Sequence, residues 1–361
     1  MISDKSSIDE GIVEQINRGR KKFRVDHFDI LVSEYVARFN NGKIILDPPY
    51  QRTFRWDIVN QSQLIESVLL GLPLPPIFVF SNQNALWEVI DGVQRTTTFC
   101  NFLNDKVNKH IFEGCEILTE LNGKSYSDLP EFVKNSLGNV RLRIEIIEDT
   151  ADIQSQYLLF SRLNSNGINL SPQELRNFLI YKINPDFYNK INDLKNNELF
   201  KSAIDFKSSR KEKQEDLEYV IRFFLSRKFA LDKPSPNSYN KIDNLITAEI
   251  KEFLENNTPV SLEKEYGIFV ETFAFINNLL GPNSFRYFIP KINSIVNTYS
   301  IAPALSFFLD EYKNHEKTKS VIKSFYDSEK YQQITKQSYS PTKRMFDLSK
   351  YAYEFFSENK E

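Results

Sequence analysis

The segment from Asp91 to Arg95 combines residue types that can bind an anion at the start of a helix. It follows the apolar run 86–90 and precedes a stretch with helical spacing. The first turn of a helix has free backbone N–H groups and the positive end of the helix dipole, which attract phosphate. A solvent-facing Arg95 would add a bidentate guanidinium. The candidate residues for this phosphate site are Asp91, Gly92, Arg95, Thr96 and Thr97.

Asp91 and Arg95 are the catalytic candidates within this segment. Asp91 is also the candidate metal contact, because a carboxylate can hold Mg²⁺ that accompanies a nucleotide or can orient a water. A D-G turn before a helix also occurs as plain structure. An ion pair between Arg52 and Asp91 that only supports the fold is a second alternative.

A second polar segment, Tyr50-Gln51-Arg52, follows the short extended run 43–46 and Pro48-Pro49. The two prolines favour extended or turn backbone and stop any helix. Arg52 could contact the same anion as Arg95, so Tyr50, Gln51 and Arg52 are ligand-binding candidates. The nearby Trp56 is interpreted as a core or rim aromatic, with stacking on a base as the alternative.

Residues 25–150 are expected to form a mixed α/β domain that positions both segments. Asp57 can cap a helix that Gly71 ends, and the runs 77–80 and 86–90 predict a hairpin. Alternating apolar and charged residues predict a strand over 141–147. A helix is expected over 94–103.

Residues 151–361 are expected to form an all-helical domain, and residues 1–24 an N-terminal segment. Ser171-Pro172-Gln173-Glu174 matches a capping box with proline in the first helical turn. The overall fold class is therefore α+β. Helices are expected near 152–163, 186–199, 214–230, 241–255, 262–279, 286–297, 301–314 and 343–357.

The turn at 164–167 and the helix after Ser171 form either a helix joint with a capping role or a cover for the site. In the second interpretation Asn164 and Arg176 bind the ligand. Two basic clusters are candidates for DNA contact, although charged runs are more often solvated faces. Their candidate residues are Arg20, Lys21, Lys22, Lys207, Arg210 and Lys211.

Composition argues against several classes of protein. The net charge of −2 gives no broadly basic field, so nucleic-acid contact would have to be local. Two cysteines and three separated histidines do not suggest a thiolate or histidine metal site. No signal-like or membrane-spanning apolar run is found, so we expect a cytoplasmic protein without membrane partners.

Three stretches, DPPYQRTFRW, LIESVLLGLPLPPIFVF and WEVIDGVQRTTTFCNFL, resemble in order and spacing a known N-terminal domain. This is the DGQQR-motif domain of GmrSD-type modification-dependent restriction enzymes and SspE-like defence proteins. The later stretch FSRLNSNGINLSPQELRNF resembles the second signature of the same family. The resemblance covers roughly residues 30–180.

The resemblance implies a ParB- and sulfiredoxin-like core in which the D-G-Q-Q-R turn binds nucleotide phosphates. In some members it supports NTP hydrolysis that controls DNA cleavage. By position, Asp91, Gly92, Gln94 and Arg95 stand on that turn, so the resemblance adds Gln94 to the catalytic candidates. Val93 replaces the first glutamine of the motif, so one side-chain amide is lost. His315 is the only histidine after residue 110, so no H-N-H nuclease centre is expected in the C-terminal half.

Three functions remain open from the sequence. The first is a nucleotide-binding component of an anti-phage or modification-dependent restriction system, with or without NTP hydrolysis. The second is an enzyme that nicks modified phage DNA or processes a modified base, and the third is a non-catalytic binding module. The expected partners are nucleotide or DNA phosphate, modified phage DNA and a separately encoded nuclease, with Mg²⁺ as the expected cofactor.

Overall fold

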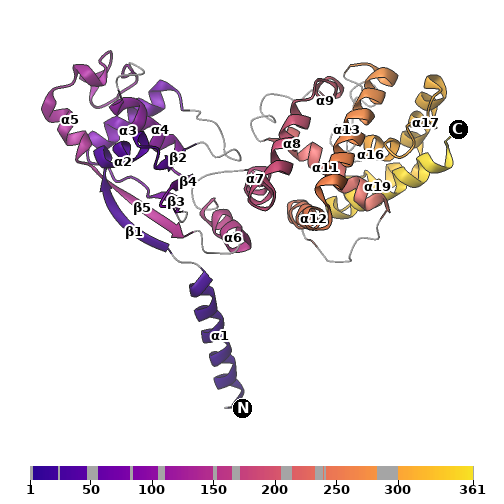
Figure 1. Cartoon of the computed structure of the whole chain (residues 1–361), viewed down its shortest axis with the longest axis horizontal. Helices are drawn as coiled ribbons and strands as arrows, with labels where there is room; N and C mark the ends of the chain where they lie inside the picture. Colours follow the sequence, from indigo (N-terminus) through magenta and orange to yellow (C-terminus); the bar gives the residue numbers. More distant parts are fainter. Residues whose placement is uncertain are drawn as a thin grey trace. The chain divides into compact units, whose positions relative to one another are not determined.

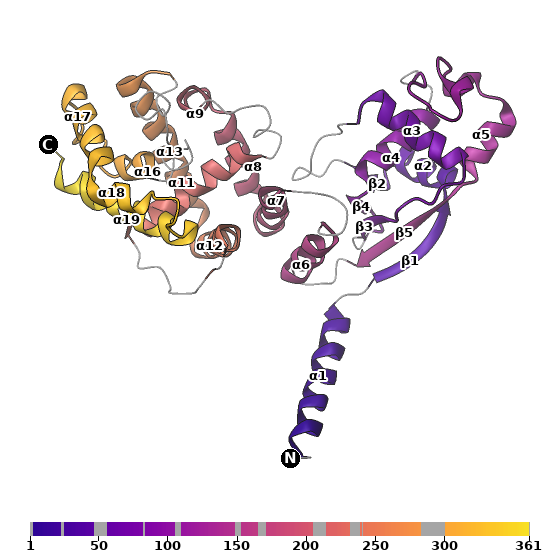
Figure 2. The same cartoon turned by 180° about the vertical axis from the view of Figure 1, so that it is seen from behind.

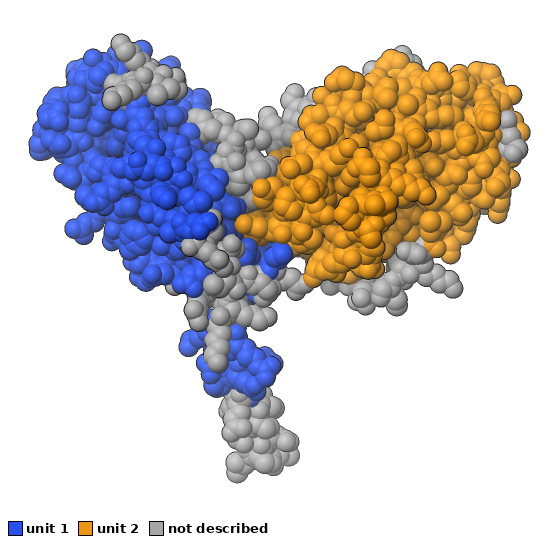
Figure 3. Space-filling view, viewed as in Figure 1, with its two compact units in different colours: residues 1–169 blue, residues 170–361 orange. Residues whose placement is uncertain are grey.

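The computed structural model describes residues 3–22, 25–46, 56–81, 84–104, 110–148, 153–164, 171–204, 214–231, 239, 241–282 and 300–360. The chain divides into two compact units, residues 1–169 and residues 170–361 (Figure 3). Unit 1 is mixed α/β and unit 2 is helical, which confirms the expected α+β class.

Unit 1 contains a sheet, α-helices and two short 3₁₀ turns (Figure 1). Its strands are β1 (Val25–Leu31), β2 (Ile44–Ile45), β3 (Ile77–Ser81), β4 (Trp87–Asp91) and β5 (Arg141–Glu148). Its helices are α1 (Ser3–Lys22), α2 (Val32–Asn40), α3 (Ile58–Leu69), α4 (Val93–Leu103), α5 (Glu131–Gly138) and α6 (Ile153–Asn164). The 3₁₀ turns are η1 (Thr119–Leu121) and η2 (Tyr126–Asp128).

The described strands form one mixed sheet in the order β1-β5-β3-β4-β2. The central pair β3 and β5 is parallel, as is the edge pair β2 and β4. The β3–β4 and β1–β5 pairs are antiparallel. The carboxyl ends of β2 and β4 therefore lie at the same end of the sheet.

One face of the sheet is covered by helices. Leu142 and Ile144 of β5 are buried, whereas Arg141 and Arg143, which alternate with them along the strand, are exposed. Helices α2 to α5 lie together on one side of the sheet in both views (Figures 1 and 2). The alternation along β5 is thus the pattern expected of a strand with one buried face.

Unit 2 is built from helices in the part of the chain that the structure describes. They are α7 (Pro172–Ile183), α8 (Pro185–Asn196), α9 (Glu198–Ala203), α11 (Glu215–Leu231), α12 (Ile242–Asn256), α13 (Pro259–Leu280), α16 (Ile301–Leu305), α17 (His315–Asp327), α18 (Glu329–Ile334) and α19 (Pro341–Glu358).

Helix α11 lies at the centre of this unit, packed against α7, α8, α12, α16 and α19. It is buried on nearly all sides, as a helix surrounded by other helices must be. Its Phe223 and Phe224 contact aromatic rings of the neighbouring helices, with centroid separations of 5.0 Å to Phe269 and 6.1 Å to Phe253.

Several boundaries differ from the expected ones. The helix expected over 301–314 ends at Leu305, and turns follow it to residue 311. The helix expected over 186–199 is two helices, because Asn197 has extended backbone and caps α9. Strand β1 and helices α1, α2, α5, α17 and α18 were not expected. The expected helix over 286–297 lies outside the described residues.

Candidate functional site

Strand β2, which precedes the Tyr50-Gln51-Arg52 segment in sequence, runs toward the end of the sheet where the Asp91 turn lies. Strand β2 runs parallel to β4, with Ile44 paired to Trp87 and Ile45 to Glu88. The chain therefore leaves β2 in the direction in which β4 runs to its last residue, Asp91. Residues 47–55, with the three ligand-binding candidates among them, lie outside the described residues.

The far end of this loop is fixed next to the same turn through the main chain of Trp56. The Trp56 backbone N–H donates to Oε1 of Gln94 at 3.0 Å. The Trp56 carbonyl accepts from Nε2 of the buried Gln61 at 3.1 Å, and Asn101 donates to Gln61 at 3.4 Å. We call these contacts the Trp56 clamp. Trp56, the first described residue after this segment, therefore lies beside the turn between β4 and α4.

Gly92 makes the turn between β4 and α4, and its backbone requires glycine. Its φ of 99° lies in the left-handed region, and a Cβ there would be 3.0 Å from Cγ1 of Ile77. Glycine at the N-cap position of α4 has no side chain with which to cap the helix. This is the helix start that the sequence predicted.

Arg95 is more enclosed than its expected solvent-facing role implied. Its side chain is only 12% exposed and lies 3.4 Å from the Asp91 carboxylate. It also donates to the carbonyls of Pro75, through a short bond, and of Pro76 at 3.2 Å. The guanidinium thus ties the start of β3 to the end of β4, and the expectation of a solvent-facing Arg95 is corrected.

Burial governs the charge state of this pair. Desolvation raises the pKa of the Asp91 carboxyl above its usual range, while Arg95 and the Gly92 N–H partly oppose the shift. Desolvation likewise lowers the pKa of Arg95, against the attraction of Asp91. Asp91 is therefore a carboxylate with a cationic partner in place, and 22% of its side chain is exposed.

The threonines after Arg95 divide into core and surface residues. The Thr96 hydroxyl lies 3.1 Å from the Tyr35 hydroxyl, and both side chains are fully buried. Thr98 is also buried and donates to the Gln94 carbonyl at 2.8 Å. Thr97 is half-buried. Among these three threonines, Thr97 is the one with an accessible side chain.

A buried carboxylate next to this region holds a loop by its backbone. Glu66 of α3 accepts from the N–H groups of Glu116, Ile117 and Leu118 at 3.2, 2.8 and 2.6 Å. Burial alone would raise the pKa of Glu66, but the three donors lower it below its usual value. Glu66 and Gln61 are polar residues on the inward face of α3. Polar residues at buried positions of a helix mark such contacts, and neither residue was expected from the sequence.

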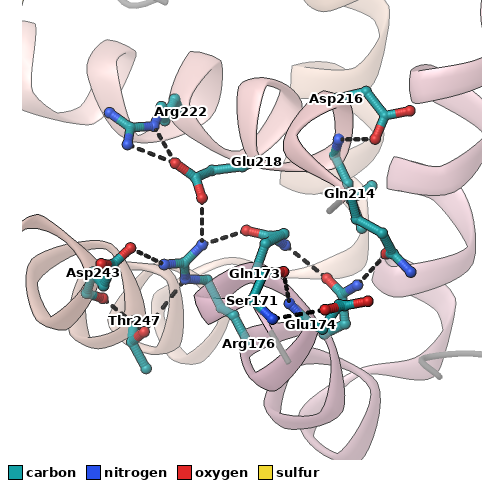
Figure 4. A network of polar contacts seen from close by, with 12 residues as sticks. Ser171, Gln173, Glu174, Arg176, Gln214, Asp216, Glu218, Arg222, Asp243 and Thr247 are labelled. Atoms are coloured by element: carbon teal, nitrogen blue, oxygen red, sulfur yellow. Dashed lines mark hydrogen bonds and ion pairs between the residues drawn. The ribbon is translucent and has the colours of Figure 1, made fainter. Parts of the chain in front are cut away.

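Arg176 is the centre of a polar network inside unit 2 (Figure 4). Its side chain has no exposed surface and reaches Glu218 at 3.4 Å and Asp243 at 3.5 Å. It also donates to Thr247 at 3.3 Å and, through a short bond, to Gln173. Arg222 binds the same Glu218 at 2.8 Å. Arg176 therefore joins α7 to α11 and α12.

The capping box at the start of α7 is confirmed. The Ser171 side chain accepts from the Glu174 N–H at 3.3 Å, and the Glu174 carboxylate accepts from the Ser171 N–H at 2.7 Å. Asn164 ends α6, but its side chain lies outside the description. A ligand could reach Arg176 only by displacing partners within unit 2.

Most of the basic candidates for DNA contact lie outside the described part of the chain. Arg20 is exposed on α1, whereas the side chains of Lys21 and Lys22 and all of Lys207, Arg210 and Lys211 fall outside the description. Within the described ranges, no group of three or more His, Cys, Asp or Glu side chains is placed to hold a metal ion. None of the described helices is long and apolar enough to cross a membrane.

The sheet defines a mixed α/β domain in which the glycine turn between β4 and α4 lies beside Trp56. Residues 32–181 match the family described as GmrSD restriction endonuclease, N-terminal domain. The match runs from the start of α2 into α7. Neither a curated protein nor a solved structure matches the chain.

Proposed function

We propose that this chain is a nucleotide-binding component of a modification-dependent restriction system, with its site at the β4–α4 turn. The observation that carries the proposal is the 3.0 Å bond from the Trp56 N–H to Gln94, which joins the end of the Tyr50-Gln51-Arg52 loop to that turn. The family match over residues 32–181 supports the restriction context, in which DNA is the ultimate substrate.

The contacts within the turn support separate roles for the candidate residues: some bind phosphate and others hold the turn. The first-turn N–H groups of α4 and the Thr97 hydroxyl bind the phosphate. Arg95 is engaged by Asp91 and by the carbonyls of Pro75 and Pro76, so it builds the turn. We assign the direct cationic contact to Arg52, because Trp56, four residues further along the chain, is bonded to Gln94 at the turn.

Mg²⁺ fits this arrangement as a companion of the nucleotide. Magnesium is commonly held by one or two carboxylates together with substrate phosphates, and it keeps several waters. Asp91 supplies one partly exposed carboxylate at the turn. In a hydrolysing site the same carboxylate would orient the attacking water, and the valine at position 93 supplies no amide to help.

Binding of ATP, GTP, unmodified DNA and modified DNA by the full chain, with and without Mg²⁺, tests the proposal. We expect nucleotide binding that Arg52→Ala abolishes and that Arg55→Ala, a matched change three residues along the same loop, leaves intact. Binding only to modified DNA would favour a direct DNA-acting enzyme. Absence of binding to every probe would favour the non-catalytic binding module, in which the domain keeps its fold but its β4–α4 turn binds no phosphate.

A further inference from the structure

Helix α1 is a long helix with an uncovered apolar stripe. Ile12, Val13 and Ile16 are 50%, 56% and 47% exposed. Ile8 precedes Ile12 by four positions in the same helix, so the four residues fall on one side of it. None of the principal packing contacts between described elements involves α1.

A helix of this composition needs a partner to be stable. Isolated helices of this length are marginal in water, and each internal glycine costs about 1 kcal/mol relative to alanine. Gly11 and Gly19 both lie within α1, and nothing lies within 4 Å of the position that a Cβ would take at either residue. An ion pair between Glu14 and Arg18 on the exposed surface contributes little. The stripe is therefore the feature through which α1 can gain stability.

The charges of α1 specify what can cover the stripe. Residues 3–14 contain four acidic residues and one lysine, whereas residues 15–22 contain four basic residues and no acid. Two copies in parallel would place like charges together. Two antiparallel copies place each acidic half beside the basic half of the other, with the apolar stripe between them.

We propose that α1 is a self-association surface, on which the α1 helix of a second copy of this chain packs antiparallel. The pair has two-fold symmetry about a point near Ile12, so the apolar stripe of one copy packs against the stripe of the other. Such an interface is isologous, with the same patch used on both copies. It is small, so the dimer dissociates on dilution.

Sedimentation equilibrium of the full chain across a concentration series tests self-association. The expected species at high concentration has twice the 42.3 kDa of one chain. Ile12→Asp buries a charge at the centre of the stripe and should weaken the dimer at least roughly tenfold. The matched control is Asn17→Asp, which adds the same charge about 140° around the helix and should leave the dimer intact.

Disulfide trapping tests the orientation. In an antiparallel pair, Ile12→Cys places the two thiols together, whereas Lys5→Cys places them about 21 Å apart along the axis. Cys100 and Cys115 are buried, and burial raises the pKa of their thiols to about 12 and about 11, so they do not compete. Ile12→Cys should therefore cross-link and Lys5→Cys should not.

Three results would overturn the proposal. The first is a wild-type chain that remains monomeric at the highest concentration. The second is a dimer that Ile12→Asp leaves unchanged, because the interface would then lie elsewhere. The third is cross-linking of Lys5→Cys as readily as Ile12→Cys, which would mean a parallel pair. All variants change positions of α1, and unchanged thermal unfolding of the rest of the chain verifies that they fold.

Discussion

The side-chain oxygen of Gln94 accepts a hydrogen bond from the backbone N–H of Trp56, although the two residues are 38 positions apart in sequence. Gln94 stands in the first turn of α4, and Trp56 closes the loop that carries Tyr50-Gln51-Arg52. The glutamine thus positions one motif relative to the other. Its amide is used within the protein, which favours a positioning role over direct chemistry.

Gln94→Leu should release the Trp56 clamp. We expect faster hydrogen exchange at the Trp56 amide and an affinity for nucleotide lowered by about tenfold, the scale of one lost hydrogen bond. Gln94→Glu keeps an acceptor oxygen, so it should retain protection of Trp56 even though its charge repels phosphate. Equal protection of Trp56 in wild type and Gln94→Leu would contradict the positioning role.

Arg95→Ala should lower the free energy of unfolding of unit 1 by about 2 kcal/mol, because it leaves the partly buried Asp91 carboxylate and two carbonyls without their donor. Chemical denaturation measures this change. Arg143→Ala is the matched control: its ion pair with Asp29 is 3.4 Å long but about half exposed, so its loss should cost less than about 0.5 kcal/mol. Equal effects of the two changes would mean that Arg95 does not support the turn.

The contact between Glu66 and the loop should make stability depend on pH. The folded-state pKa of Glu66 lies below its usual value, so its stabilising effect is present above the ordinary glutamate range. The effect disappears as the pH falls through the lowered folded-state pKa. Glu66→Gln should therefore lower the Tm at neutral pH, and the gap to wild type should close in acid. Glu120→Gln, an exposed change in the same region, should leave the Tm unchanged at every pH.

Arg176→Met should destabilise unit 2 by about 3 kcal/mol, the usual scale for removing one partner of a buried ion pair. Lys201→Met is the control, because the pair of Lys201 with Glu198 is exposed. We expect nucleotide affinity to change by less than about twofold, because Arg176 is fully engaged inside unit 2. Titration below the unfolding transition measures this, and loss of binding with the fold intact would assign Arg176 to the ligand.

The sequence predicts the elements whose local pattern is strong. The Asp57 cap, the hairpin of β3 and β4, the alternating strand β5 and the Ser171 capping box are all present. Strand β1 has no such pattern, because it is an edge strand with several exposed residues, Phe28 among them. Its identity as a strand depends on its pairing with β5, more than 110 positions away in sequence.

The candidate site was predicted as a set of residue types, but not as a set of contacts. The D-G turn and the helix after it follow from the sequence. The partners of Arg95 do not, because the carbonyls of Pro75 and Pro76 have no side-chain signature. The role of Gln61 was also missed, since a buried polar residue on an apolar helix face is visible in sequence only once that face is known.

Because strand β1 and the partners of Arg176 lie outside residues 32–181, we expect that this stretch does not fold as a separate piece. Excised at these limits, it would lose β1 and leave the backbone of β5 bare along one side, a template for aggregation. At the other limit it would carry α7 away from α11 and α12 and leave the Arg176 guanidinium without its carboxylates. Swapping this domain between restriction proteins therefore requires junctions before Val25 and a matching helical unit as recipient.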